Sequence, residues 1–298
     1  MANPFKSVTC SVRYDNARII SWSMLPGGNY PEDFILEVEN SRDGGPWETI
    51  ATNLTNVCAY VDTRRRNYNK YMNENYRVRL KSESTQQNWV SDPVHAGYTD
   101  VYPFSSEAQN ILKQTQNAIR ISGCSGVLLK KKTWGTKCPD CVDFDGQVSV
   151  NEHCPKCLGT GILGGYYNGI SMGVIKDQIV NKEDDAVMGY NQLETVSGRC
   201  IAYPWIRNGD VWVEDGTNKR YNITEAVVIS AYKTVPLILK ITMHLLERTD
   251  VLYIDPASAK VTLKDVFASA EVTYTPQTEA AQETNSMNSW QATLDNTL

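Results

Sequence analysis

The chain has 298 residues, of which 41% are hydrophobic and 21% charged, and its formal net charge is −5. Plentiful apolar residues and an ordinary charged fraction exclude disorder throughout, and neither collagen-like nor coiled-coil repeats occur. The mild acidity argues against wholesale nucleic-acid binding, which usually involves a basic domain. At roughly 100–200 residues per domain, this length predicts two or three domains.

Neither an export signal nor a membrane-spanning segment is apparent. The first residues, Met1 to Ser7, lack the long apolar core of a secretion signal. The most apolar candidate for a membrane span, Val235 to Leu246, is short and is broken by Lys240 and His244. We therefore expect a soluble chain that does not enter the general secretory route and has no membrane partner.

Residues 7–97 predict a β-sandwich. Short segments alternate between apolar and polar residues, and turn signals such as Pro26-Gly27-Gly28 separate them. A strand roughly every 8–12 residues is typical of this architecture. The predicted strands are Val8–Val12, Ala17–Trp22, Phe34–Glu39, Trp47–Ile50, Cys58–Asp62 and Tyr76–Leu80. On the last strand we expect Tyr76, Val78 and Leu80 to face the core, with the intervening basic residues on the opposite face.

These residues resemble a fibronectin type III domain. Trp22 in the second strand, Trp47 in the middle and the late strand Tyr76–Leu80 match the pattern of that family. The closing segment Trp89–Pro93 matches it as well. The resemblance implies that residues 1–98 form a sandwich that serves as a spacer or an adhesive surface. We expect both tryptophans and Tyr76 to pack in its core.

Residues 99–125 predict a linker followed by one amphipathic helix. Ser105-Ser106-Glu107 combines a serine cap with an acidic residue in the first turn. Residues that belong to one helical face then recur at near-helical spacing, until Gly123 ends the run. These positions are Ile111, Leu112, Thr115, Ala118, Ile119 and Ile121. We expect the helix to pack on a neighbouring domain or subunit.

Two Cys-x-x-Cys pairs, Cys138 with Cys141 and Cys154 with Cys157, carry the strongest chemical signal of the chain. Two such pairs, twelve residues apart, fit a tetrahedral Cys₄ zinc site. A redox function is the alternative for either pair alone, but the closeness of the two pairs favours a metal. Four thiolates leave no open coordination position, so we expect a structural zinc knuckle in residues 126–168. His153 is either a substitute ligand or a surface histidine.

The second pair continues as Cys157-Leu-Gly-Thr-Gly161, which is similar to the zinc motif of DnaJ-type chaperones, but the first pair lacks its glycines and no His-Pro-Asp triplet occurs. The longer stretch from Gly135 to Tyr167 resembles a segment of structural proteins of tailed bacteriophages. In that family a helix and a small zinc knuckle precede a β-rich region, and the resemblance extends from about Glu107 to Pro256.

Residues 169–275 predict a small antiparallel barrel or sandwich that forms an oligomer. Asn208-Gly209-Asp210 and Asp215-Gly216 are turn signals between short strands. Val235 to Met243 alternates along one long strand. The order of these features resembles the head-closure and neck proteins of tailed phages, whose small barrels assemble into rings between portal and tail.

The polar segment 276–298 is either an unsupported tail or an arm that folds onto a neighbouring subunit, with Trp290 as its anchor. We expect the four isolated cysteines to form no disulfides; they are Cys10, Cys58, Cys124 and Cys200.

No combination of residues predicts an enzyme. The three histidines lie in different regions, and no nucleophile elbow, phosphate-binding loop or His-Glu-x-x-His helix occurs. We expect the acidic cluster Glu183-Asp184-Asp185 in a solvated turn, with a hard cation as the alternative, and Asp143 and Asp145 lack a partner base. The basic residues Arg64–Arg66 with Lys70 predict a solvated loop or a contact to an acidic partner. Lys130–Lys132 either touch DNA or an acidic subunit or form a solvated rim.

Together these patterns predict a mainly β, multidomain chain with a fibronectin III-like sandwich, a linking helix, a zinc knuckle and a small antiparallel barrel or sandwich. The phage resemblance implies a non-catalytic neck or head-to-tail connector subunit of a virion assembled in the bacterial host cytoplasm. Its implied partners are its own copies in a ring and the portal or adaptor and tail-terminator proteins, with DNA passing through without sequence-specific binding. The alternatives are a tail or baseplate subunit and a zinc-knuckle nucleic-acid-binding protein.

Overall fold

In the computed structural model the chain is mainly β and divides among several antiparallel sheets, which confirms the predicted fold class. The structure describes residues 3–12, 17–26, 34–64, 74–82, 84–95, 106–141, 153–183, 192–203, 205–232 and 235–254. By internal contacts the chain separates into two units, residues 1–267 and 268–298, and every described residue lies in the first. The domain boundaries drawn from the sequence stay predictions.

Several predicted features lie outside the described residues. They are Arg65, Arg66 and Lys70, the linker 98–103 with Ser105, Asp143 and Asp145, Asp184 and Asp185, and the arm 276–298 with Trp290. Neither of the helices described is long and apolar enough to cross a bilayer.

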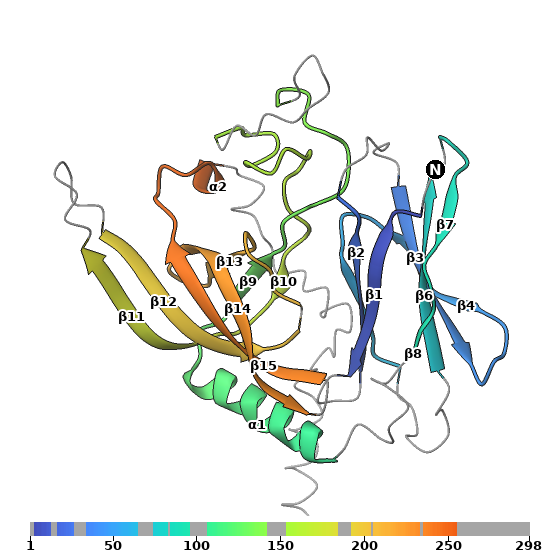
Figure 1. Ribbon diagram of the computed structural model, residues 1–298, viewed down its shortest axis with the longest axis horizontal. Helices are drawn as coiled ribbons and strands as arrows, with labels where there is room; N and C mark the ends of the chain where they lie inside the picture. The colour runs from blue at the N-terminus through green and yellow to red at the C-terminus, as the bar shows by residue number, and fades with distance from the viewer. Residues whose placement is uncertain are drawn as a thin grey trace, which may run out of the picture. The chain divides into compact units, whose positions relative to one another are not determined.

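Residues 5–95 form two antiparallel sheets, the sandwich that the strand pattern predicts (Figure 1). The first sheet has the order β1-β2-β5 and consists of β1 (Phe5–Val12), β2 (Arg18–Met24) and β5 (Ala59–Asp62). The second has the order β4-β3-β6-β7 and consists of β3 (Phe34–Arg42), β4 (Glu48–Leu54), β6 (Glu74–Ser82) and β7 (Asn88–Val90). A short strand, β8 (Val94–His95), also pairs with β6.

Alternate residues of the facing strands fill one core between the two sheets. Tyr76, Val78 and Leu80 on β6 are fully buried, and Trp22 from β2 packs in the same cluster. The basic residues between them on β6 are only half-buried, as the period of two predicts. The hydroxyl of Tyr76 donates a hydrogen bond of 2.9 Å to Asp62, so the buried phenol keeps a polar partner.

Trp47 is not a core residue, so that prediction is wrong. It precedes β4, is half-buried and lies outside the core cluster. The guanidinium of Arg77, on the outward face of β6, stands 4.1 Å from the centre of the Trp47 ring. An indole face attracts a cation at this distance, so Trp47 covers the charged outer face of the sheet. The sequence shows that a tryptophan precedes this strand, but it does not show on which side of the sheet the indole lies.

The second half of the chain forms one seven-stranded antiparallel sheet with the order β10-β9-β13-β14-β15-β12-β11. Its strands are β9 (Gly126–Leu129), β10 (Ile170–Ser171), β11 (Ile175–Glu183), β12 (Gln192–Ile201), β13 (Val211–Glu214), β14 (Arg220–Tyr232) and β15 (Val235–Leu245). The predicted turn Asp215-Gly216 joins β13 to β14, and Gly216 has a φ of 80°, a conformation that glycine adopts readily.

The sheet closes into a barrel, because its two end strands are consecutive in the chain. Only Met172–Val174 separate β10 from β11. Together β10, this linker and β11 form one stretch of chain, which pairs with β9 at β10 and with β12 along β11. Between the two, an isolated bridge joins Cys124 to Val174. One stretch of chain therefore joins both ends of the sheet. Of the two predicted architectures, barrel or sandwich, the structure has the barrel.

The barrel interior is apolar and contains two neighbouring aromatic side chains whose rings are tilted relative to each other. The rings of Trp212 and Tyr221 lie 5.7 Å apart, and the indole N–H of Trp212 donates to the carbonyl of Met172. β15 shows the predicted alternation, since its interior positions are buried and Lys240, which lies between two of them in the sequence, is exposed. These interior positions are Leu239, Ile241 and Met243, and Leu237 is buried in a separate cluster with Leu112.

Gly126–Leu129, which the sequence analysis groups with the zinc knuckle, is strand β9 of the barrel. All four of its residues are buried. β9 pairs with β13 and with β10, so residues 130–169 form a long excursion between two neighbouring strands. A strand of four residues carries no periodic signal, and its partners lie far away in the sequence.

Helix α1 (Ser106–Ser122) is the predicted amphipathic helix, and it packs on the barrel. Leu112 meets Leu237 of β15, and Ile119 is also buried. Ile121, which the sequence places on the apolar face, is 86% exposed, so that prediction is wrong. Two residues along a helix correspond to about 200° of rotation, and Ile121 therefore lies on the far side from Ile119. A short helix, α2 (Val251–Ile254), packs against β9 and β13.

We predict that Ile241→Ala destabilises the barrel by about 2–5 kcal/mol, because it leaves a cavity in the interior. Urea unfolding followed by circular dichroism measures the loss. Lys240→Ala on the same strand is the matched control and should change the free energy of unfolding by less than about 0.5 kcal/mol. Equal effects of the two substitutions would contradict the register of β15.

Candidate metal centre

Four cysteines meet in the excursion between β9 and β10. Cys138, Cys141, Cys154 and Cys157, hereafter the thiol cluster, are all buried, and their sulfur atoms lie within 4.8 Å of one another. The Sγ atoms of Cys138 and Cys154 are 3.7 Å apart, and those of Cys141 and Cys157 are 3.6 Å apart. A tetrahedral metal with bonds of about 2.3 Å separates its sulfur ligands by about 3.8 Å, whereas a disulfide needs about 2.05 Å. The predicted ligand set is therefore arranged around one common centre.

Each Cys-x-x-Cys pair folds into a tight turn whose backbone amides point at sulfur. In the second turn the amide groups of Cys157 and Lys156 bond to the thiol of Cys154, and these bonds lower the pKa of Cys154 to about 7. In the first turn the amide group of Asp140 bonds to Cys138, but burial raises the pKa of that thiol. Amide donors favour the thiolate form, which is the form that binds a metal.

The two turns are joined side by side. The amide of Cys138 donates to the carbonyl of Gly161 at 2.9 Å, and the amide of Leu163 donates to the carbonyl of Thr136 at 2.9 Å. Gly161 has a φ of 77°, which a residue with a Cβ seldom adopts. The glycine pattern after the second cysteine pair thus serves a backbone bend that brings this segment back to the first pair.

The chemistry of the donor set fits a metal. The four sulfur atoms form a buried cluster by themselves, with no other apolar side chain in it. Four small thiols bury little apolar surface, and four thiolates repel one another unless a cation lies between them. A divalent ion would neutralise that charge and hold the two turns together.

Side chains on both sides hold the excursion in place. Trp134, four residues before the first cysteine, packs in the sandwich core, with its ring 5.1 Å from that of Phe34. Leu158 packs with Val251 of α2 and with β9. Sequence alone does not place Trp134 in the sandwich core, because Phe34 lies a hundred residues earlier in the chain.

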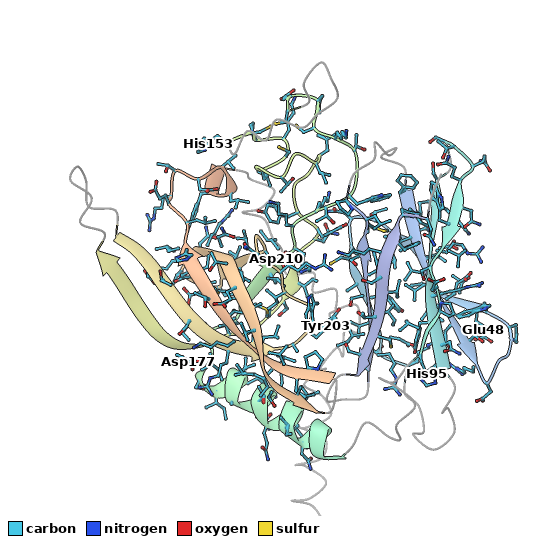
Figure 2. All side chains as sticks on the ribbon, viewed as in Figure 1. Glu48, His95, His153, Asp177, Tyr203 and Asp210 are labelled. Atoms are coloured by element: carbon cyan, nitrogen blue, oxygen red, sulfur yellow. The ribbon has the colours of Figure 1, made fainter. Side chains whose placement is uncertain are left out.

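Lys130, the first residue of the lysine run, lies at the stem of the excursion, and its ammonium group is paired with the carboxylate of Asp210. Asp210 is labelled in Figure 2. Asp210 is 1% exposed. It also accepts the backbone N–H groups of Lys131 at 2.9 Å and of Arg207 at 2.8 Å. This carboxylate therefore joins the end of β9 to the turn before β13.

Only one of the three lysines extends freely into solvent. The ammonium group of Lys132 donates to the carbonyl of Leu163, and burial lowers its pKa. Lys130 is 13% exposed, whereas Lys131 is exposed. The sequence predicts either a contact surface or a solvated rim at Lys130–Lys132. The structure shows no continuous basic surface there, because only Lys131 is exposed.

The histidines do not meet at a common site. His153, which is exposed, lies outside the group of four possible ligands, and so the surface alternative holds for it. His95 lies in β8, and the Nδ1 of His244 is bonded to Thr195 at 2.9 Å. No disulfide joins any of the eight cysteines, all of which are described, as predicted. Burial raises the pKa of both Cys58 and Cys200 to about 12, which makes these thiols unreactive.

A polar network at one end of the barrel is the main feature that the sequence analysis missed. The ammonium group of Lys176 donates to Glu214 at 2.6 Å and to the hydroxyl of Tyr221 at 3.2 Å. That hydroxyl donates to Glu194 at 3.3 Å. Burial opposes ionisation of Glu214, but the hydrogen bonds from Lys176 and Thr217 lower its pKa overall. The groups of this network are bonded to one another, which indicates a structural role.

No protein-family model matches the chain, and no curated protein matches it in sequence. Among solved structures, the pectate lyase Pel3 from Pectobacterium carotovorum is 20% identical over 33% of this chain and 27% of that chain, with a TM-score of 0.24. Titin kinase with its flanking domains is 12% identical over 83% of this chain and 38% of that chain, also with a TM-score of 0.24. The chain thus spans well under half of either protein. Likenesses at this TM-score carry no argument about fold or function.

We predict that Asp210→Asn destabilises the protein by about 3–5 kcal/mol, because it leaves the ammonium group of Lys130 buried without its counter-charge. The double variant Lys130→Met with Asp210→Leu should be closer to wild type than the single variant. Urea unfolding measures both.

The control is the exposed ion pair of Lys156 with Asp140, whose side chains are about half exposed and 2.9 Å apart. Lys156→Ala should cost less than about 1 kcal/mol. A loss of that small size in Asp210→Asn would show that the buried pair does not fix the stem.

Proposed function

We propose that the thiol cluster binds one zinc ion and that the chain is a structural subunit of a tailed-phage virion, most consistent with a neck or head-to-tail connector ring. The observation that carries the proposal is the closed thiol cluster, because four buried sulfur ligands leave no coordination position for a substrate. The assignment to phage particles rests on the resemblance of residues 107–256 to structural proteins of that family.

Zinc suits this cluster better than the other metals that thiolates bind. A tetrahedral set of four sulfurs is taken by zinc or by iron. Residues 134–161 include few large apolar residues, so a metal would supply folding energy there. Zinc supplies it without redox chemistry. Structural zinc sites contribute about 10–16 kcal/mol in small zinc peptides. When bound, zinc would hold the two turns together, and Cys138, Cys141, Cys154 and Cys157 would be its ligands.

In this proposal the parts of the chain have separate mechanical roles. The barrel and α1 build the ring, and the zinc-stiffened excursion reaches an adjacent protein of the particle. The sandwich decorates the outside, as the fibronectin type III resemblance implies. The proposed partners are other copies of this chain and the portal-side and tail-side proteins. DNA passes through the ring without sequence-specific binding.

The environment of the lysine run weakens the support for a nucleic-acid-binding function. It rests on Lys130–Lys132 as a basic surface beside the zinc knuckle. Because Lys130 is paired with a buried carboxylate and Lys132 is half-buried, Lys131 is the one lysine of the run with an exposed side chain. A single exposed cation supplies little phosphate affinity.

We predict that the purified chain contains one zinc ion and that Cys154→Ser loses it. The substitution removes one of four ligands and the thiol that accepts two backbone amides. The amides of Cys138 and Leu163, which join the two turns, should then exchange hydrogen rapidly, while β3 and β6 stay protected. Elemental analysis and hydrogen exchange measure the two effects.

Cys124→Ser is the control for the metal experiment, because Cys124 is an isolated thiol outside the cluster. It should retain a full complement of zinc. Full zinc occupancy in Cys154→Ser would contradict the ligand assignment, and iron in the wild-type protein would contradict the identity of the metal.

The virion assignment predicts that the chain is present in purified particles of the phage that encodes it, in a fixed copy number. Mass spectrometry of such particles detects it, and electron microscopy of labelled particles distinguishes a neck position from a tail or baseplate position. Absence of the chain from intact particles would overturn the proposal.

A further inference from the structure

Strand β14 extends beyond the barrel and leaves one of its edges open. Its pairing with β13 ends at Asn222, whereas its pairing with β15 continues to Tyr232. From Glu225 to Tyr232, no strand in the described part of the chain covers the other edge. The same stretch has three consecutive exposed apolar side chains, Val227 (47%), Val228 (40%) and Ile229 (49%).

An edge of this composition is unusual for a protein that stays alone. The sequence Ala226–Tyr232 is Ala-Val-Val-Ile-Ser-Ala-Tyr and contains no charge, proline or glycine. Proteins normally protect an open edge with charged residues, proline or a covering segment, because its backbone groups pair readily with another strand. The pairing of β14 with β15 is irregular around Ser230, but it is regular from Glu225 to Val228, and within Ala226–Val228 the described residues provide no such protection. This regular part of the edge is therefore suited to pairing with another strand.

A second open edge lies at the opposite end of the same run of strands. β11 pairs with β12 along its length, and the described residues place no strand on its other side from Lys176 to Glu183. Thr195 lies opposite His244, and Ile201 lies opposite Ile238, so the β11–β12 and β14–β15 pairs extend in opposite directions. Figure 1 shows these two free ends on opposite sides of the barrel.

The two edges match each other in direction and in charge. In the order β14-β15-β12-β11 all neighbours are antiparallel, so β11 of one copy and β14 of an equally oriented copy also run antiparallel. In one register Glu225 lies opposite Lys182. This register also places Val227 opposite Val180 and Val228 opposite Ile179. By sequence, this register sets a glutamate against a lysine and two apolar residues against two apolar residues, and cross-strand pairs of these types stabilise a sheet.

We propose that the β14 edge of one copy pairs with the β11 edge of a second copy of this chain. The contact is heterologous, since two different edges meet, and such a contact generates a ring when the rotation between copies closes. The inference deepens the proposed function by naming the contact that would build the ring. The pairing of the two edges is argued from the strands themselves, whereas the closure of the copies into a ring rests on the proposed function.

Cysteine cross-linking tests the register directly. A double variant, Ile179→Cys with Val228→Cys, should form a ladder of covalent oligomers under mild oxidation, with zinc present to protect the thiol cluster. Each single variant should form no ladder, like the wild type with its eight native cysteines. Covalent dimers of the Val228→Cys single variant would show that two β14 edges pair with each other, which overturns the proposal.

Charge and bulk test the same contact without cross-linking. Val228→Lys should abolish oligomers in analytical ultracentrifugation, whereas Ile121→Lys, at an exposed isoleucine on α1, should leave them intact. Glu225→Lys should weaken assembly, and Glu225→Lys combined with Lys182→Glu should restore it. Zinc content and the unfolding transition confirm that each variant is folded.

The outcomes separate this inference from the proposed function. Oligomers that persist in Val228→Lys, or a wild-type chain that stays monomeric, would overturn the β14–β11 contact and leave the virion assignment to its own test. Absence from particles, together with a full cross-linking ladder, would overturn the virion assignment and keep the contact.

Discussion

The closing of the long excursion between β9 and β10 is the constraint on which this half of the molecule depends. The chain leaves the barrel after β9 and returns to it at β10, so closing this connection, and ordering its described residues 130–141 and 153–169, must offset a large loss of chain entropy. Among the described residues of the excursion, Trp134 packs on the sandwich core and Leu158 packs beside α2, whereas the cluster that lies within the excursion itself consists of the four thiols. The two cysteine turns, with backbone amides directed at sulfur, make a metal the natural source of that free energy.

The stem of the excursion depends on a different interaction. Asp210 is buried and accepts the ammonium group of Lys130 together with two backbone amides. A buried carboxylate with fewer partners would destabilise the fold, whereas one with all its partners fixes the relative position of two chain segments. The thiol cluster orders the tip and the Lys130–Asp210 pair orders the base. The same pair explains why a lysine run that looks like a binding surface in sequence is largely structural.

The features that the sequence predicts well are those whose signal is local. The alternation along β6 and β15, the helix ending at Gly123 and the Cys-x-x-Cys spacing each lie within one short segment. The features that it misses depend on partners far away: Trp134 meets Phe34, and Lys130 meets Asp210 80 residues later. Trp47 and Ile121 show a second limit, because an apolar residue next to a periodic pattern can lie on either face.

The distribution of polar partners also limits how this chain can recognise others. Lys176, Glu214, Tyr221 and Glu194 bond to one another in the barrel, and Glu39 binds both Arg77 and Arg79 on the sandwich. Charged groups already held in such pairs contribute little to a new contact, since the existing bonds must first be broken. Backbone edges carry no such cost, because their N–H and C=O groups exchange water for another strand. A chain built in this way is suited to the proposed assembly by extension of its sheet, while the thiol cluster and the Lys130–Asp210 pair hold the excursion beside β9 and β13.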